Sequence, residues 1–127
     1  MADVPELVEP EVVVHGLANC DTVKRARQWL TANGVPHRFH DFKKAGVSAE
    51  QLASWMAELG WEKLLNRQGT TWRKLDDHAK ASIEDAAAAA ELMHAMPSVI
   101  KRPVVRWGGG EVTVGFDSAA FARCASA

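Results

Sequence analysis

Cys20 is the residue whose type and position best suit it to chemistry. It follows a β-branched run at residues 12–14 and comes directly before a segment with helical periodicity that begins at Asp21. A strand that enters a helix through a tight turn places the cysteine sulfur near the free N–H groups and the positive end of that helix. This setting stabilises the thiolate, which is the reactive form of cysteine. We therefore expect Cys20 to be a nucleophile.

The remaining cysteine and the histidines narrow the kind of chemistry. Cys124 lies far from Cys20 in the sequence, and Val23 stands where a Cys-x-x-Cys motif would have its second thiol. Two cysteines are too few for a disulfide scaffold, so we expect a reducing, cytoplasmic setting. We expect Cys124 to pack in the core, although a role as a distant resolving thiol stays open. The histidine and cysteine spacings do not predict a metal site, and we interpret the five histidines as surface or packing residues.

Length and composition indicate one globular domain without a nucleic-acid or membrane partner. The chain has 127 residues, a net charge of −1, 47% hydrophobic and 24% charged residues. We expect a single domain over residues 11–127, preceded by a flexible arm over residues 1–10. The nearly neutral charge argues against direct binding to nucleic acid, and no apolar stretch approaches the roughly 20 residues of a membrane span.

The first half of the sequence predicts two parallel strands and a crossover helix. Residues 12–17 form a continuous apolar strand pattern, and a helix pattern from residue 21 ends at Asn33-Gly34. Residues 37–42 alternate like a second strand. A strand, helix and strand in this order favour a right-handed crossover between parallel strands.

The middle of the chain is expected to be helical. Ser48 and Gln51 have the spacing of a capping box, and the helix that they open runs to Gly60. A short helical segment is predicted at residues 61–65, and a polar loop at 66–71. Ser82 with Asp85 is predicted to cap a further helix through the alanine run to Met96.

The last part of the chain predicts a hairpin and a final helix. Three glycines separate the strand patterns at residues 103–107 and 111–114, and Asp117 has the position of a helix cap. The whole order is β-α-β, a helical insertion, then β-β-α. It predicts an α/β protein with a thioredoxin-like fold, an inserted helical bundle and a mixed sheet.

Three segments together resemble one known family. They are Gly-Leu-Ala-Asn-Cys-Asp-Thr-Val-Lys at residues 16–24, Leu-Leu-Asn-Arg-Gln-Gly-Thr-Thr at 64–71, and Pro-Ser-Val-Ile-Lys-Arg-Pro-Val-Val at 97–105. Over residues 11–124 the chain resembles the arsenate reductase (ArsC)/Spx family, and within it the YffB-like branch. The resemblance implies that Cys20 carries out redox or thiol-transfer chemistry. It also implies that Arg102 lies beside the sulfur and that the Arg102–Pro103 peptide bond is cis.

The resemblance gives the neighbouring residues expected roles. Arg102 would stabilise the thiolate and orient an anionic group, since a guanidinium binds carboxylates and oxyanions with two hydrogen bonds. Lys24 and Arg67 would hold a glutathione carboxylate or an oxyanion, Asn19 would contribute to the same binding site or cap the helix, and Pro103 would shape it. Glutathione, not tightly bound, or a glutaredoxin-type partner would release the adduct on Cys20, because no second thiol is nearby in sequence. The substrate would be a small thiol compound or an oxyanion.

Two alternative functions stay open. One is arsenate reduction proper, although Asn66 and Gly115 stand about where the family's arsenate reductases have further arginines. The other is a non-catalytic, Spx-like adaptor or transcription regulator that binds a protein partner, although Val23 removes the Cys-x-x-Cys switch of those regulators. The adaptor function predicts an ordinary pKa for Cys20 and partner binding that survives Cys20→Ala.

Overall fold

A four-stranded mixed sheet lies at the centre of the computed structural model, which describes residues 11–126. The strands β1 (Val12–Gly16), β2 (His37–Asp41), β3 (Val104–Arg106) and β4 (Val112–Val114) have the order β2-β1-β3-β4. β1 pairs in parallel with β2 and antiparallel with β3, and β3 pairs antiparallel with β4. The predicted parallel pair and hairpin are therefore confirmed. The predicted N-terminal arm at residues 1–10 lies outside the described residues.

Helix α1 (Asp21–Ala32) is the crossover between the two parallel strands. Its side chains Val23, Ala26 and Leu30 are buried, at the three- and four-residue spacing of one helix face. Gly34 follows the helix with φ of 69°, a conformation that glycine adopts without a steric penalty. This end at Asn33-Gly34 was predicted, and it fixes the direction in which the chain enters β2.

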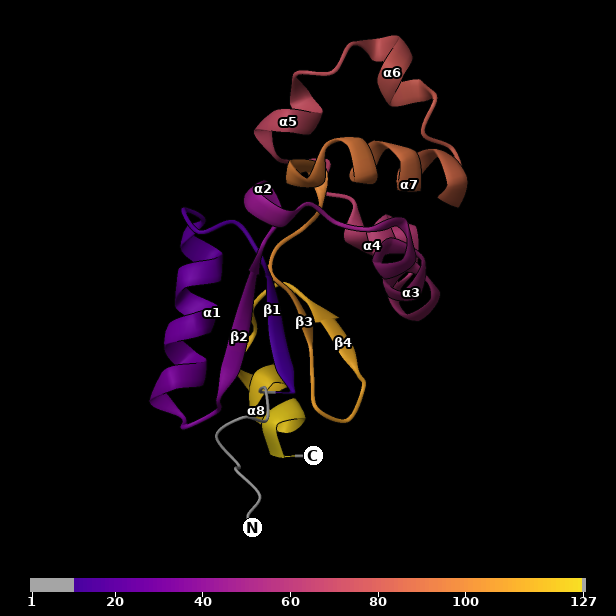
Figure 1. Ribbon diagram of the computed structural model, residues 1–127. Helices are drawn as coiled ribbons and strands as arrows, with labels where there is room; N and C mark the ends of the chain where they lie inside the picture. Colours follow the sequence, from indigo (N-terminus) through magenta and orange to yellow (C-terminus); the bar gives the residue numbers. More distant parts are fainter. Residues whose placement is uncertain (1–10, 127) are drawn as a thin grey trace.

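The segment between β2 and β3 is helical, as predicted. It contains α2 (Phe42–Ala45), α3 (Ala49–Leu59), α4 (Trp61–Leu64), α5 (Thr70–Arg73), α6 (Asp77–Ala81), α7 (Ala86–Ala95) and the 3₁₀ helix η2 (Pro97–Val99). Most of these helices gather above the end of the sheet where β1 finishes (Figure 1). The predicted capping box opens α3: the Gln51 N–H donates to Ser48 Oγ at 3.1 Å, and the Ser48 N–H donates to Gln51 Oε1 at 3.2 Å.

Parts of the insertion differ from the sequence prediction. The polar loop expected at residues 66–71 ends at Thr70, where α5 begins, and α6 was not predicted. Asp85 alone caps α7, accepting the Ala88 N–H at 2.9 Å. Ser82 instead follows α6, and its hydroxyl donates to the Ala79 carbonyl at 2.7 Å. A serine hydroxyl that is satisfied within its own turn is not free to cap a later helix.

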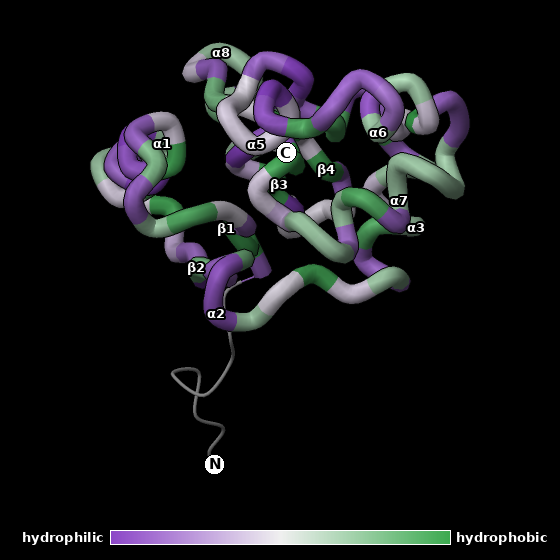
Figure 2. Tube along the Cα trace, turned by 90° about the horizontal axis from the view of Figure 1, so that it is seen from above, coloured by the Kyte–Doolittle hydropathy of each residue, from purple (hydrophilic) through white to green (hydrophobic). Residues whose placement is uncertain are grey.

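The apolar side chains form two clusters, one on each face of the sheet. On one face α1 and α8 (Ser118–Ser126) cover a cluster that includes Val14, Leu30, Val105 and Phe121. The second cluster joins Val104 and Val112 to apolar residues of the inserted helices, among them Leu52, Leu64 and Met93. Viewed from above, α1 and the helices α3, α6 and α7 lie on either side of β1 and β3 (Figure 2). The architecture is the expected α/β, thioredoxin-like fold with a helical insertion.

Candidate active site

The structure places Cys20 directly before α1, as the sequence predicts. Cys20 is the N-cap residue and is partly buried, and its carbonyl accepts the Lys24 N–H at 3.0 Å. The side chain makes no capping hydrogen bond, since a neutral thiol is a weak acceptor. Asn19, which was considered as the cap, comes one residue before the N-cap and is exposed. The sulfur therefore stands at the positive end of α1.

The surroundings of Cys20 lower the pKa of its thiol. Burial is the largest single influence and raises the pKa, because it disfavours the charged form. The Val23 backbone N–H, the Arg102 guanidinium with its hydrogen bond and its charge, and the Thr22 backbone N–H all act in the opposite direction. Together they outweigh burial, so the net shift favours the thiolate.

Backbone carbonyls hold Arg102 in place beside the sulfur. Its Nη1 donates to the Ser98 carbonyl at 2.7 Å and to the Ile100 carbonyl at 3.3 Å. Its Nε is buried and has no hydrogen-bond partner among the described residues. The Arg102–Pro103 peptide bond is cis, as the resemblance implied, and Pro103 is buried. Anchoring one nitrogen of the guanidinium leaves the rest of the group for the thiolate or a bound anion.

The segment that carries Arg102 is tied to the helical insertion. The Asn66 N–H donates to the Val99 carbonyl at 2.8 Å, and the Lys101 N–H donates to the Leu64 carbonyl at 2.7 Å. The Thr71 and Ser98 hydroxyls form a hydrogen bond of 2.9 Å. The second of the three segments that suggested the family, residues 64–71, is thus hydrogen-bonded to the third, residues 97–105. These contacts explain how the helical insertion, which lies far from Cys20 in the sequence, can position Arg102.

The other charged residues predicted to bind a ligand, Lys24 and Arg67, lie in two different parts of the fold. Lys24 is exposed on α1, about one turn after Cys20. The Arg67 guanidinium lies over the rings of Trp61 and Trp72, 5.5 and 5.8 Å from their centroids. Arg67 is not among the groups that shift the pKa of Cys20. The structure thus brings Arg102 to the sulfur and leaves Arg67 stacked on tryptophans of the insertion.

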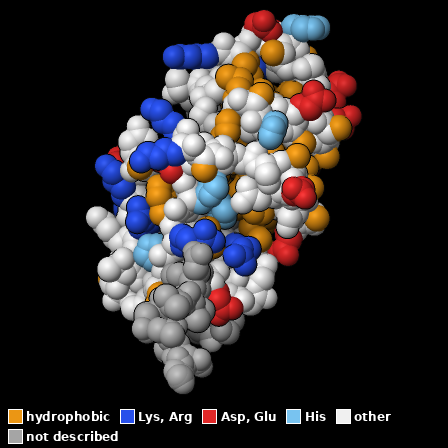
Figure 3. All heavy atoms as spheres, in the orientation of Figure 1, with side chains coloured by type: hydrophobic (Ala, Val, Ile, Leu, Met, Phe, Trp, Pro, Cys, Tyr) orange, Lys and Arg blue, Asp and Glu red, His pale blue; other side chains and the backbone are white. Residues whose placement is uncertain are grey.

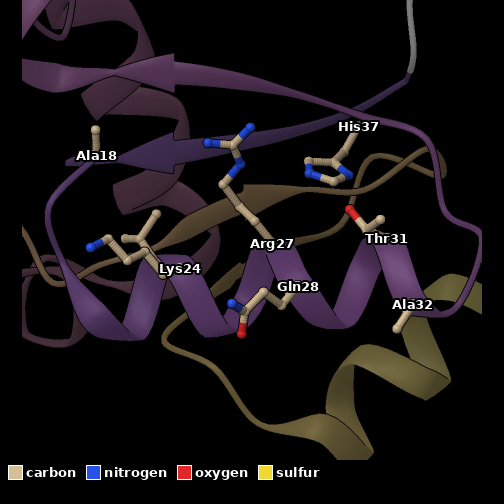
Figure 4. A pocket seen from close by; sticks show the side chains of 8 residues that line it. Ala18, Lys24, Arg27, Gln28, Thr31, Ala32 and His37 are labelled. Carbon is tan, nitrogen blue, oxygen red and sulfur yellow. The ribbon is translucent and has the colours of Figure 1, made fainter.

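A groove beside α1 contains Lys24. It has a volume of about 460 Å³, and its walls include Ala18, Lys24, Arg27, Thr31 and His37. Figure 4 shows Arg27 and Thr31 projecting from α1 toward the strand that carries His37, with Lys24 and Ala18 nearer the Cys20 end of the helix. The groove is basic along the wall that α1 supplies. It can therefore accept a carboxylate-bearing ligand.

A second hollow lies on the other side of the turn between β1 and α1. It measures about 340 Å³ and is lined by Leu17, Phe42, Lys43, Pro97 and Ser98. Leu17 lines this hollow and Ala18 lines the groove beside α1, so the turn that carries Cys20 separates the two. Cys20 is in the wall of neither.

Cys124 lies in a different environment. It is buried on α8, and its Sγ donates to Glu111 Oε1 at 3.5 Å. Burial, followed by the Glu111 hydrogen bond and charge, raises the pKa of the Cys124 thiol. Figure 1 shows α8 near the end of the sheet opposite to the start of α1. Both cysteines are free thiols, and the fold does not bring them together.

Several groups of this site carry no signal in the sequence. The groups that lower the pKa of Cys20 include the backbone N–H groups of Thr22 and Val23, and the anchors of Arg102 are backbone carbonyls. Ser98 was left out of the chemistry, yet its carbonyl makes the shorter of the two contacts to Arg102. Backbone atoms are present at every residue, so only the fold could reveal which of them converge here.

Comparison with known proteins agrees with this geometry. Residues 15–124 match the ArsC family. The chain belongs to this family. An uncharacterized protein of Haemophilus influenzae is 36% identical over 106 residues, which are 84% of this chain and 91% of that protein. The fold and the arrangement of the three segments are therefore those of ArsC family members.

Two solved structures show the same likeness. A protein named YffB is 49% identical, with a TM-score of 0.84, over 89% of this chain and 97% of that one. An arsenate reductase (ArsC) related protein from Brucella melitensis is 46% identical, with a TM-score of 0.70, over 88% of this chain and 92% of that one. The chain is thus arsenate reductase-like, which indicates a reductase.

Among the residues that the structure describes, there is neither a membrane-spanning helix nor a cluster of metal ligands. Within residues 11–126, no helix has both the length and the apolar character needed to cross a bilayer. In the same residues, His, Cys, Asp and Glu side chains form no group of three or more that could hold a metal ion.

Proposed function

We propose that this protein is a thiol-dependent reductase in which Cys20 is the nucleophile and glutathione is the reductant or co-substrate. The observation that carries the proposal is the joint effect of the helix start and Arg102, which together lower the pKa of Cys20 despite its partial burial. A thiolate held at this position can attack a sulfur or another electrophilic centre. The free state of both cysteines is consistent with a reducing, cytoplasmic setting.

The absence of a nearby second thiol in the described residues favours a one-cysteine cycle. The Cys20 thiolate attacks the glutathione sulfur of a mixed disulfide R–S–S–G, forming Cys20–S–S–G and releasing RS⁻, which takes up a proton. A glutathione thiolate then attacks the glutathione sulfur of the Cys20–S–S–G disulfide, forming G–S–S–G and releasing Cys20 as the thiolate. In total, R–S–S–G and one glutathione thiol give R–SH and G–S–S–G. Cys124 takes no part.

The groove beside α1 supports glutathione as the ligand. Glutathione carries two carboxylates and one ammonium group, and the α1 wall of the groove supplies Lys24 and Arg27. Asn19 and Pro103 border the turn and the arginine segment, and we assign them to shaping the site. Arg67 would contribute by contact with a larger substrate that extends over Trp61 and Trp72.

The proposal is tested by the reduction of a glutathione mixed disulfide, R–S–S–G. The rate is measured from the oxidised glutathione that forms. Cys20→Ser is expected to reduce the rate to that of the uncatalysed reaction, while Cys124→Ala retains the rate of the original chain. Equal loss in both variants would favour an internal disulfide cycle between the two thiols. If the protein shows no turnover, and Cys20 has an ordinary pKa, the adaptor function replaces the reductase.

A further inference from the structure

A small polar cavity lies on the face of the sheet that is turned away from α1. It measures about 200 Å³ and opens between β1, β2, β3 and α3. Along β1, Val12 and Val14 belong to the cluster under α1 and α8, so His15 points to the other face. Figure 3 shows pale blue histidine side chains and blue basic side chains close together on the molecule. The polar part of the wall consists of His15, Arg38, His40, Gln51, Ser54 and Arg106.

A buried histidine at position 15 lowers the stability of the fold. It is only 4% exposed, and its Nδ1 has no hydrogen-bond partner among the described residues. Leaving a buried polar atom unpaired costs about 1–3 kcal/mol. A fourth valine after residues 12–14 would continue the apolar strand without this cost. The unpaired nitrogen in a cavity wall therefore indicates a group that meets a ligand.

The rings around His15 hold it in one orientation. The His40 ring lies at a centroid distance of 5.0 Å, and the Trp55 ring at 4.8 Å in an edge-to-face arrangement. His40 Nε2 also makes a hydrogen bond of 2.9 Å to the Gly46 carbonyl. The two imidazoles are thus fixed by packing and by the backbone. A ligand would find them already in place.

The charges around the cavity favour an anion. Burial and the charges of His40, Arg106 and Arg38 lower the pKa of His15 to about 3, so its ring is neutral at physiological pH. The lasting positive charge comes from Arg38 and Arg106, and no acidic residue is among the described residues of the wall. Two arginines disfavour a metal cation here. They suit an oxyanion, which can accept two hydrogen bonds from one guanidinium.

The size of the cavity limits the ligand. Sites for drug-sized molecules usually have volumes of roughly 300–1,000 Å³, and this cavity lies below that range. We propose that the cavity binds a small phosphate-type oxyanion, either free or as the terminal group of a small phosphorylated compound. Arg106 would supply the charge, and His15 would donate an imidazole N–H. Cys20 does not line this cavity, so the site is separate from the candidate active site.

Titration with inorganic phosphate at constant ionic strength tests the inference, with chloride as the reference anion. The resonances of the His15 and His40 imidazoles, followed by NMR, should shift to saturation with phosphate and stay unchanged with chloride. Glycerol phosphate as a second probe separates the two sources. Tighter binding of the ester assigns the site to phosphorylated compounds, and tighter binding of inorganic phosphate assigns it to the free ion.

Matched variants place the binding in this cavity. Arg106→Gln is expected to weaken phosphate binding at least about tenfold, since it removes a charged hydrogen-bond donor. Arg25→Gln, which changes an exposed arginine of α1 outside the cavity, should leave binding unchanged. His15→Phe keeps an aromatic ring against Trp55 and should weaken binding without unfolding the chain. Equal responses to phosphate and chloride, or undiminished binding in Arg106→Gln, would overturn the inference.

Discussion

Cys20 and Cys124 are the same chemical group in two opposite environments. Both are free thiols on helices and both are partly or largely withdrawn from solvent, yet the pKa of Cys20 is lowered and that of Cys124 is raised. Burial acts in the same direction on both, because it disfavours a thiolate wherever it occurs. The difference comes from the neighbours. Cys20 faces two backbone N–H groups and Arg102, whereas Cys124 faces the carboxylate of Glu111.

This difference shows how one thiol of a chain can become reactive while the other stays inert. The helix start supplies donors to Cys20 without any charged residue, and Arg102 adds a fixed positive charge from a distant part of the sequence. Cys124 instead lies near the last turn of α8, the negative end of that helix, and burial and Glu111 outweigh the charge of Arg123, which lowers its pKa. Position in the fold, more than the residue type, decides the chemistry.

Replacing Arg102 should have the largest effect on this contrast. Arg102→Gln removes the charge and the guanidinium donor, so the pKa of Cys20 should rise and the thiolate fraction at pH 7 should fall. Alkylation rates of Cys20 at pH 7 measure this change. Arg102→Lys keeps the charge but loses the planar fork, and should give an intermediate rate.

A matched control for this prediction is Arg25→Gln, which removes an exposed arginine from α1 itself. Its alkylation rate should equal that of the original chain. A Cys20 rate that falls equally in Arg25→Gln and Arg102→Gln would mean that overall charge, and not the anchored guanidinium, controls the thiolate.

Removing each thiol should change stability in opposite directions. At pH 5, Cys20→Ser should raise the free energy of unfolding by about 1 kcal/mol, because a serine oxygen can accept the hydrogen bond that the neutral thiol does not make at this N-cap. Cys124→Ala should lower it by about 0.5–1 kcal/mol, since it leaves space beside the apolar cluster under α1 and α8. Urea denaturation measures both. A loss of stability in Cys20→Ser would show that the position is not a working N-cap.

The smallest effect is expected at Glu111. Glu111→Gln removes the carboxylate beside Cys124 and should lower the pKa of that thiol, which speeds its alkylation at pH 8 by about two- to threefold. Burial, the largest cause of the raised pKa, remains, so Cys124 should stay slower than Cys20. Mass spectrometry of each alkylated cysteine reports both rates from one sample. An unchanged Cys124 rate would leave burial as its sole control.

Much of the fold was predictable because its elements have local causes. The strand that precedes Cys20, the helix that ends at Asn33-Gly34 and the capping box at Ser48 and Gln51 all follow from short-range patterns. The expectation that Ser82 and Asp85 cap α7 together was right for Asp85 and wrong for Ser82, because both residues have cap chemistry and the alanine run that follows has no clear periodicity. The short helix α6 was not predicted.

The functional groups were predictable to a lesser degree. Cys20 and Arg102 could be named from the sequence, since a residue type and a family resemblance mark them. The carbonyl of Ser98 and the N–H groups at Thr22 and Val23 could not, because they are backbone atoms. A binding role for His15 could not be predicted from the sequence either, because a single histidine in an apolar strand has the pattern of a packing residue. Only the cavity beside its unpaired nitrogen distinguishes it.

The pH dependence of Cys20 alkylation by iodoacetamide, in the Cys124→Ala variant so that one thiol reports, tests the central claim most directly. The rate follows the thiolate fraction, so its midpoint gives the pKa of Cys20. A folded-state pKa that is lowered predicts a midpoint below the value of about 8.5 of a free thiol, returning to that value when the protein is unfolded in urea. A midpoint at or above about 8.5 in the folded protein would contradict the activated thiolate and, with it, the proposed reductase mechanism.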